Sequence, residues 1–176
     1  EVPMMSPPEL APRPVPLDPY ALGRSLGGAR QDSPVHEPVL VGADDGPASR
    51  HGLRTRRQDV EAASIPQDYL LNSLAVRLAV LQGLLDARGE VGTGWRRRGL
   101  RVSMSSAQLR DDVTFLVRSL GGTTHGRTRD RDIPDSEDHG AFVLDIRLPP
   151  GVPPFRLTHK RETYESEANN AKTHYG

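Results

Sequence analysis

Hydrophobic residues between positions 74 and 87 are too dense for a helix that faces water. Seven of the fourteen residues from Leu74 to Ala87 are Leu or Val, and only Arg77, Gln82 and Asp86 are polar. A helix with so little polar surface is buried in a core or packed against a partner. Ser73 stands at its predicted N-cap and Gly89 just beyond its end, which are residue types that start and stop helices.

A second long helix is predicted from Ala107 to Leu120, with an ordinary amphipathic pattern. Ser105 and Gln108 have the spacing of a capping box, and Gly121-Gly122 follows the last turn. Its apolar residues recur three and four positions apart, as expected for one buried helix face. They are Leu109, Val113, Leu116, Val117 and Leu120.

Alternation of hydrophobic and polar residues predicts strands at 100–105 and 141–148. The core-facing residues of these strands are expected to be Leu100, Val102, Met104, Phe142, Leu144, Ile146 and Leu148. Their other faces carry Arg101, Ser103, Ser105, Val143, Asp145 and Arg147. Residues 89–94 are typical of a strand end and a hairpin turn, and residues 123–129 of a polar strand.

The predicted elements run in the order helix, two strands, helix, two strands, helix. This order predicts an α+β unit with an antiparallel sheet. Shorter helices are expected at 20–26, after Ile65-Pro66, and from about Leu157 onward. Around these elements we expect a proline-rich extended arm, a loop-rich region and a polar, frayed tail, at 1–19, 29–64 and 163–176.

Composition narrows the class of protein. The chain of 176 residues contains no Cys and no long apolar run, which excludes disulfides, thiolate zinc sites and a membrane span. No secretory signal is visible at its start, so we expect a cytoplasmic protein. Its 23 basic and 23 acidic residues cancel, yet only Lys160 and Lys172 are lysines. The arginine bias fits a GC-rich coding sequence or contacts to phosphate and guanine, and composition does not separate these readings.

The end of the apolar helix, Leu81-Gln-Gly-Leu-Leu-Asp-Ala-Arg-Gly89, resembles the signature of the LAGLIDADG homing endonucleases. It matches that signature at Leu81, Gly83, Leu84, Asp86, Ala87 and Gly89. Segments 65–70, 77–83, 119–122 and 154–157 are similar to the flanking text of intein members, and Pro16 to Gly23 resembles a first motif copy. The resemblance covers roughly residues 14–162, with 20–64 as a truncated first repeat and 65–162 as the second.

The resemblance implies a fold, a partner and an activity. In this family two such helices pack side by side, and a four-stranded sheet lies in the major groove of duplex DNA. It therefore implies an αββαββ unit that binds double-stranded DNA and cleaves both strands site-specifically with Mg²⁺. The sheet residues implied to contact DNA are Arg96, Arg97, Arg98, Arg101, Ser103, Arg127, Arg129 and Arg147. The run at 96–98 fits a phosphate clamp or a solvated hairpin tip equally well.

The eighth motif position departs from the family, where it carries an acid that binds the catalytic metal. Here that position is Gly28 in the first copy and Arg88 in the second. Metal-assisted cleavage needs carboxylates, and an arginine repels the ion, so we expect an inactive nuclease. Asp86, whose family role is mainly structural, and Glu90 are the fallback metal ligands. Lys160 resembles the basic residue placed near the scissile phosphate.

Partners and function stay open at this point. A helix as short as 20–27 covers only part of helix 74–87, so we expect a weak homodimer through the latter. With no Cys or Ser at position 1 and no terminal His-Asn, we expect the chain not to splice by itself. Besides the degenerate endonuclease domain of an intein, two alternatives remain. One is a non-enzymatic DNA-binding module, and the other is a remnant inside a splicing host protein.

Overall fold

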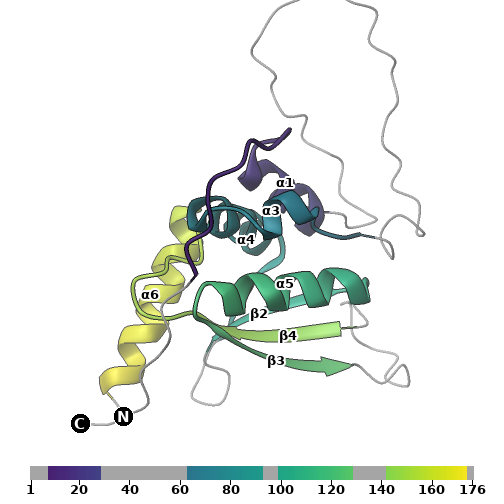
Figure 1. Cartoon of the computed structure of the whole chain (residues 1–176). Coiled ribbons are helices and arrows are strands. Elements are labelled where there is room, and N and C mark those ends of the chain that lie inside the picture. The colour runs from purple at the N-terminus through teal and green to yellow at the C-terminus, as the bar shows by residue number, and fades with distance from the viewer. Residues whose placement is uncertain (1–7, 29–62, 93–98, 129–141, 174–176) are drawn as a thin grey trace, which may run out of the picture.

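The computed structural model describes residues 8–28, 63–92, 99–128 and 142–173. They form a mixed α+β unit in which helices cover one face of a four-stranded antiparallel sheet (Figure 1). The elements, in chain order, are α1 (Pro19–Gly28), α3 (Gln67–Leu70), α4 (Leu74–Arg88), β1 (Glu90–Gly92), β2 (Gly99–Met104), α5 (Ala107–Ser119), β3 (Thr123–Thr128), β4 (Phe142–Arg147) and α6 (Thr158–Thr173). The α+β class and the predicted order of helices and strands are confirmed.

The sheet has the strand order β1-β2-β4-β3, and every neighbouring pair is antiparallel. In the central pair, Leu100 lies opposite Ile146 and Met104 opposite Phe142. The predicted alternation holds, because Leu100, Val102 and Met104 are all buried against the helices. The polar residues between them therefore lie on the face that no described helix covers, which is the lower face in Figure 1.

Helices α1 and α4 pack in parallel, with their backbones in direct contact at glycines. A Cβ added to Gly83 would lie 2.1 Å from the carbonyl oxygen of Tyr20, and one added to Gly23 would lie 2.0 Å from that of Val80. Near the C-terminal ends, a Cβ on Gly27 would meet the Cβ of Ala87 at 2.7 Å. Gly83 of the motif thus permits close approach of the two helices, with α1 of the same chain as the partner.

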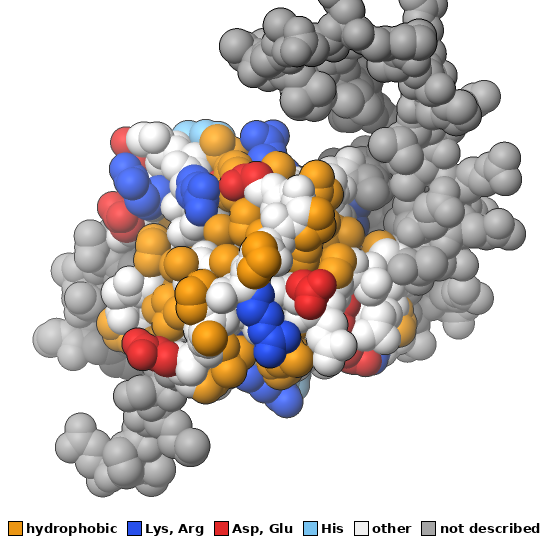
Figure 2. Space-filling view, turned by 45° about the horizontal axis from the view of Figure 1, so that its top comes forward, with side chains coloured by type: hydrophobic (Ala, Val, Ile, Leu, Met, Phe, Trp, Pro, Cys, Tyr) orange, Lys and Arg blue, Asp and Glu red, His pale blue; other side chains and the backbone are white. Residues whose placement is uncertain are grey.

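This pairing removes the argument for a dimer through α4. Leu81, Leu84 and Leu85 are at most 1% exposed within a single chain, so α1 and the core cover the face that was expected to need a second molecule. Figure 2 shows the helix side of the molecule, where hydrophobic side chains are interspersed with charged ones. A short helix suffices because glycines on both sides let the backbones touch, which brings Leu22 and Leu26 onto the core.

Arg77 is fully buried and ties three segments together. Its guanidinium donates to the carbonyls of Asn72 and Ser119, each at 3.0 Å, and to that of Pro8 in the N-terminal arm. Burial lowers the pKa of this arginine. The arm over residues 8–18 contains no helix or strand and lies against the helices, because Asn72 exchanges hydrogen bonds with the backbone of Arg13.

Two local predictions were wrong. The N-cap of α5 is Ser106, not Ser105, because the Ser106 hydroxyl accepts from Leu109 N at 3.1 Å while also donating to Ala63 O at 2.7 Å. Residues 163–173 are helical rather than frayed. Tyr164, whose ring meets that of Phe155 edge-on, anchors α6 to the core at this point. The loop expected at 29–64 lies outside the described residues up to position 62.

Candidate nucleic-acid interface

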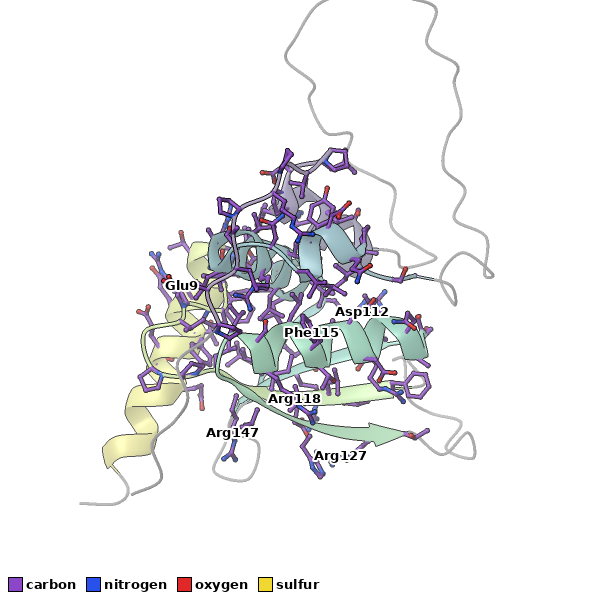
Figure 3. The ribbon with its side chains drawn as sticks, viewed as in Figure 1. Glu9, Asp112, Phe115, Arg118, Arg127 and Arg147 are labelled. Atoms are coloured by element: carbon purple, nitrogen blue, oxygen red, sulfur yellow. The ribbon has the colours of Figure 1, made fainter. Side chains whose placement is uncertain are left out.

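The uncovered face of the sheet forms a shallow, polar hollow of about 510 Å³. Strand register places Glu90, Arg101, Asp145 and His125 in one row across β1, β2, β4 and β3. Alternation along the strands adds Arg127 and Arg147 to the same face, where Figure 3 shows both pointing away from the helices. An open sheet lined by arginines is a surface suited to a large anionic partner.

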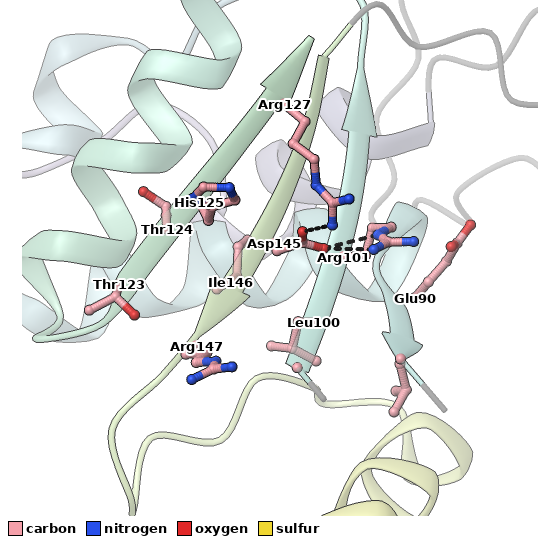
Figure 4. A pocket seen from close by; sticks show the side chains of 13 residues that line it. Glu90, Leu100, Arg101, Thr123, Thr124, His125, Arg127, Asp145, Ile146 and Arg147 are labelled. Carbon is pink, nitrogen blue, oxygen red and sulfur yellow. Dashed lines mark hydrogen bonds and ion pairs between the residues drawn. The ribbon is translucent and has the colours of Figure 1, made fainter. Parts of the chain in front are cut away.

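Asp145 organises the centre of this face. One oxygen of its carboxylate accepts a hydrogen bond from Arg101 Nε at 3.0 Å, and the other oxygen forms an ion pair with Arg127 (Figure 4). Burial alone would raise the pKa of Asp145, but hydrogen bonds from Arg127 and Arg101 outweigh it and lower that pKa below its ordinary value. The acid therefore stays ionised at neutral pH and holds both guanidinium groups in place over the strands.

Arg147 is the cation on this face that has no ion pair among the residues described. Its exposed side chain stands apart from the Asp145 cluster in Figure 4, beside the β3 residue Thr123 across the ladder. Arg127 is 59% exposed despite its ion pair. The described part of the face carries a net charge of +1 when His125 is neutral. Its three arginines outnumber its two acids, Glu90 and Asp145.

The two positions at which the resemblance places metal-binding acids are brought to one end of the helix pair. Gly28 ends α1 and Arg88 ends α4, one residue beyond the contact between Gly27 and Ala87. Arg88 points toward the sheet, because its Nη1 donates to the Ser103 carbonyl of β2 at 3.3 Å. The glycine and the cation noted in the sequence at these two motif positions therefore lie together, at the same end of the helix pair.

Asp86, the first fallback ligand, is buried and accepts hydrogen bonds mainly through one carboxylate oxygen, Oδ2. It is 4% exposed and accepts from Tyr20 Oη at 2.7 Å and from the backbone nitrogens of Arg156 and Leu157 at 3.0 and 3.2 Å. These contacts join α1, α4 and the start of α6. We therefore assign Asp86 a structural role at this junction.

Lys160 and Glu90 both lie near the end of α4 that carries Asp86. Lys160 Nζ donates to the carbonyls of Leu85, Asp86 and Gly89 at 2.9–3.1 Å, so all three of its protons cap the end of α4. Burial lowers the pKa of Lys160. Glu90 is exposed on β1, opposite Arg101. These side chains do not fit a Mg²⁺ site, and among the described residues no group of three or more His, Asp or Glu is placed to hold a metal ion.

Sequence reasoning identified part of this face. Arg101, Arg127 and Arg147 line it as expected, and Arg96, Arg97, Arg98 and Arg129 lie outside the described residues. Ser103 is on the same side of β2 by alternation, but it is buried and does not line the hollow. Asp145 and His125 were missed as members of the site. The alternation had placed Asp145 on this face, but only the register across three strands shows that it links two arginines.

No family model matches the chain, and no curated protein matches its sequence. Within the described residues, no helix has the length and apolar character needed to cross a membrane.

Proposed function

We propose that this chain is a LAGLIDADG-type module that binds double-stranded DNA on its open sheet and does not cleave it. One observation carries the proposal: the parallel, glycine-packed pair of α1 and α4 beside a four-stranded sheet with an arginine-bearing open face. A pair of helices joined in this way, above such a sheet, is what the resemblance implies for a DNA-binding unit. The intein origin, with a splicing host protein as partner, belongs to the same proposal.

The binding chemistry follows from the open face. The resemblance implies that a sheet of this kind lies in the major groove, which also admits helices and two-stranded ribbons in other proteins. Arg147 and Arg127 provide charge for phosphates or for the acceptor pair of guanine. Asp145 fixes the directions of Arg101 and Arg127, and so reduces the conformational entropy that these side chains lose on binding.

The absence of cleavage follows from the helix ends. Hydrolysis of a phosphodiester with Mg²⁺ needs carboxylates that hold the ion and activate water. Gly28 supplies no ligand, Arg88 supplies a positive charge, and the carboxylate of Asp86 is occupied by hydrogen bonds to α1 and to the start of α6. A cation at this point favours a bound phosphate and disfavours a bound metal.

The test is a titration of fluorescent duplex DNA of random sequence at several salt concentrations. We expect non-specific binding in the range of about 10⁻⁴ to 10⁻⁶ M near physiological salt, with an affinity that falls steeply as salt rises. Arg147→Gln should lower the slope of log K against log salt by about 0.9, the value of one lost phosphate contact. Gln removes the charge and retains a hydrogen-bonding amide, although on a shorter side chain.

The matched control is Arg161→Gln on α6, which removes the same charge away from the sheet. Absence of binding at low salt would overturn the proposal and favour the reading of a remnant without DNA contact. Equal slopes for Arg147→Gln and Arg161→Gln would show that the open face is not the binding surface.

A further inference from the structure

A second hollow lies on the other side of strand β3, between that strand and α5. It has a volume of about 270 Å³ and opens at the edge of the sheet. β3 is an edge strand, paired only with β4 among the described strands. Its helix-facing residues are Thr124, Gly126 and Thr128, which lie opposite Ile146, Leu144 and Phe142. Because these three side chains are small, α5 does not close over the strand, and a groove remains.

The α5 wall of this groove is cationic. Arg110, Thr114 and Arg118 are spaced four residues apart, so they share one face of the helix over about 12 Å. Arg118 is exposed and descends from α5 toward the sheet edge in Figure 3. No ion pair joins Arg118 to any other described residue. Arg110 is held by stacking over the Phe142 ring, 4.7 Å from its centroid.

The groove differs from the open face in the charges that line it. The open face mixes three arginines with Glu90 and Asp145. The groove is lined by three arginines and three threonine hydroxyls, with no Asp or Glu in its lining. Asp111, which pairs with Arg110 at 2.8 Å, is not among the lining residues. Arginine and threonine side chains are donors to phosphate oxygens, so this chemistry fits a phosphodiester chain.

Arg127 connects the two surfaces. It lines the open face through its contact with Asp145 and also lines the groove between α5 and β3. A cationic path therefore runs from Arg147 on the open face, past Arg127 at the edge strand, to Arg118 and Arg110. We infer that the groove between α5 and β3 is a phosphate-binding site for the sugar–phosphate backbone of the duplex that the open sheet engages. This inference rests on the proposed function and adds a second surface to it.

The site gives affinity without sequence preference, because its donors reach phosphates and no base edges. The double variant Arg110→Gln/Arg118→Gln tests this in the full chain with random-sequence duplex DNA as the probe. We expect the slope of log K against log salt to fall by about 1.8, or two phosphate contacts. The ratio of affinities for any two duplex sequences should stay unchanged.

The matched control is Arg24→Gln/Arg161→Gln, two exposed arginines on α1 and α6 that remove the same charge elsewhere. Thermal unfolding shows whether each double variant is folded. If loss of the contact between Arg110 and Phe142 unfolds Arg110→Gln/Arg118→Gln, the single variant Arg118→Gln, which keeps that contact, is tested in its place. Equal slopes for the two double variants, or an unchanged slope for a folded Arg118→Gln, would overturn the inference. The proposed function would still stand if Arg147→Gln lowers the slope, whereas a wild-type chain that binds no duplex would overturn both.

Discussion

The Tyr20 hydroxyl donates a hydrogen bond of 2.7 Å to Asp86, which joins the first helix to the last residues of the motif on α4. The guanidinium of Arg156 stacks over the same Tyr20 ring, 4.4 Å from its centroid. Burial is the main cause that raises the pKa of Tyr20, and the hydrogen bond to Asp86 adds to it. The residue pair thus holds together three segments that are distant in the sequence.

Removal of this hydrogen bond should weaken the fold measurably. Tyr20→Phe loses one hydrogen bond to a charged group, so we expect the free energy of unfolding in urea to fall by about 1–2 kcal/mol. Asp86→Asn should cost more, because an amide cannot accept from Tyr20, Arg156 and Leu157 as the carboxylate does. Ser25→Ala, at an exposed hydroxyl on α1, is the control and should change little. If Asp86→Asn were neutral, the structural role assigned to this carboxylate would be wrong.

The glycines of the helix pair give a second prediction. Gly83→Ala places a methyl group against the Tyr20 carbonyl, where backbone must move, so we expect destabilisation of about 3 kcal/mol or more. Gly28→Ala is the matched control, because its added Cβ meets nothing within 4 Å and should change stability by less than about 0.5 kcal/mol. Denaturant unfolding compares the two. Equal effects would mean that α1 does not pack on α4 in solution.

Much of the fold follows from local pattern, and the rest follows from contacts that pattern does not contain. The strands were predictable because Leu100, Val102 and Met104 alternate with polar residues, and the sheet buries one face. The α1–α4 pair was only partly predictable. The motif contains Gly83, but complementary glycines on both helices are needed for so short a helix to cover the apolar face. Their register is set in three dimensions.

The candidate site divides in the same way. Which side chains share the open face follows from period-two alternation, so Arg101 and Arg147 were placed correctly. The partners of Asp86 and Lys160 could not be read from the sequence, because they come from segments about seventy residues away. A charged residue that caps a distant helix has the same local signature as one that awaits a ligand.

Cleavage offers a direct test of the helix ends. We expect the purified chain not to linearise a plasmid that carries the host protein's gene without the intein insertion, with either Mg²⁺ or Mn²⁺. The reason is that Gly28 and Arg88 supply no carboxylate and Asp86 is engaged in hydrogen bonds. Gel electrophoresis measures the outcome. Metal-dependent linearisation that disappears in Glu90→Gln or Asp86→Asn would show that the fallback ligands work, contrary to this expectation.

The last prediction concerns Asp145, which links stability to binding on the open face. Because Arg127 and Arg101 hold the folded-state pKa of Asp145 below its unfolded value, its contribution to stability is fully present above about pH 4. That contribution is lost as the pH falls through the folded-state pKa. Asp145→Asn removes this titration, so the stability difference between wild type and variant should shrink as the pH drops below about 4.

The same substitution raises the charge of the open face by one unit and releases Arg101 and Arg127 from their shared acid. At neutral pH we therefore expect Asp145→Asn to be less stable, yet to bind duplex DNA with a steeper salt dependence than wild type. Glu165→Gln, which frees Arg161 on α6, is the matched control for a charge change away from the open face and from the groove. Fluorescence titration and urea unfolding on the same samples separate the two effects. A variant that loses affinity at every salt concentration while remaining folded would show that Asp145 itself contacts the DNA, as an acceptor from cytosine would.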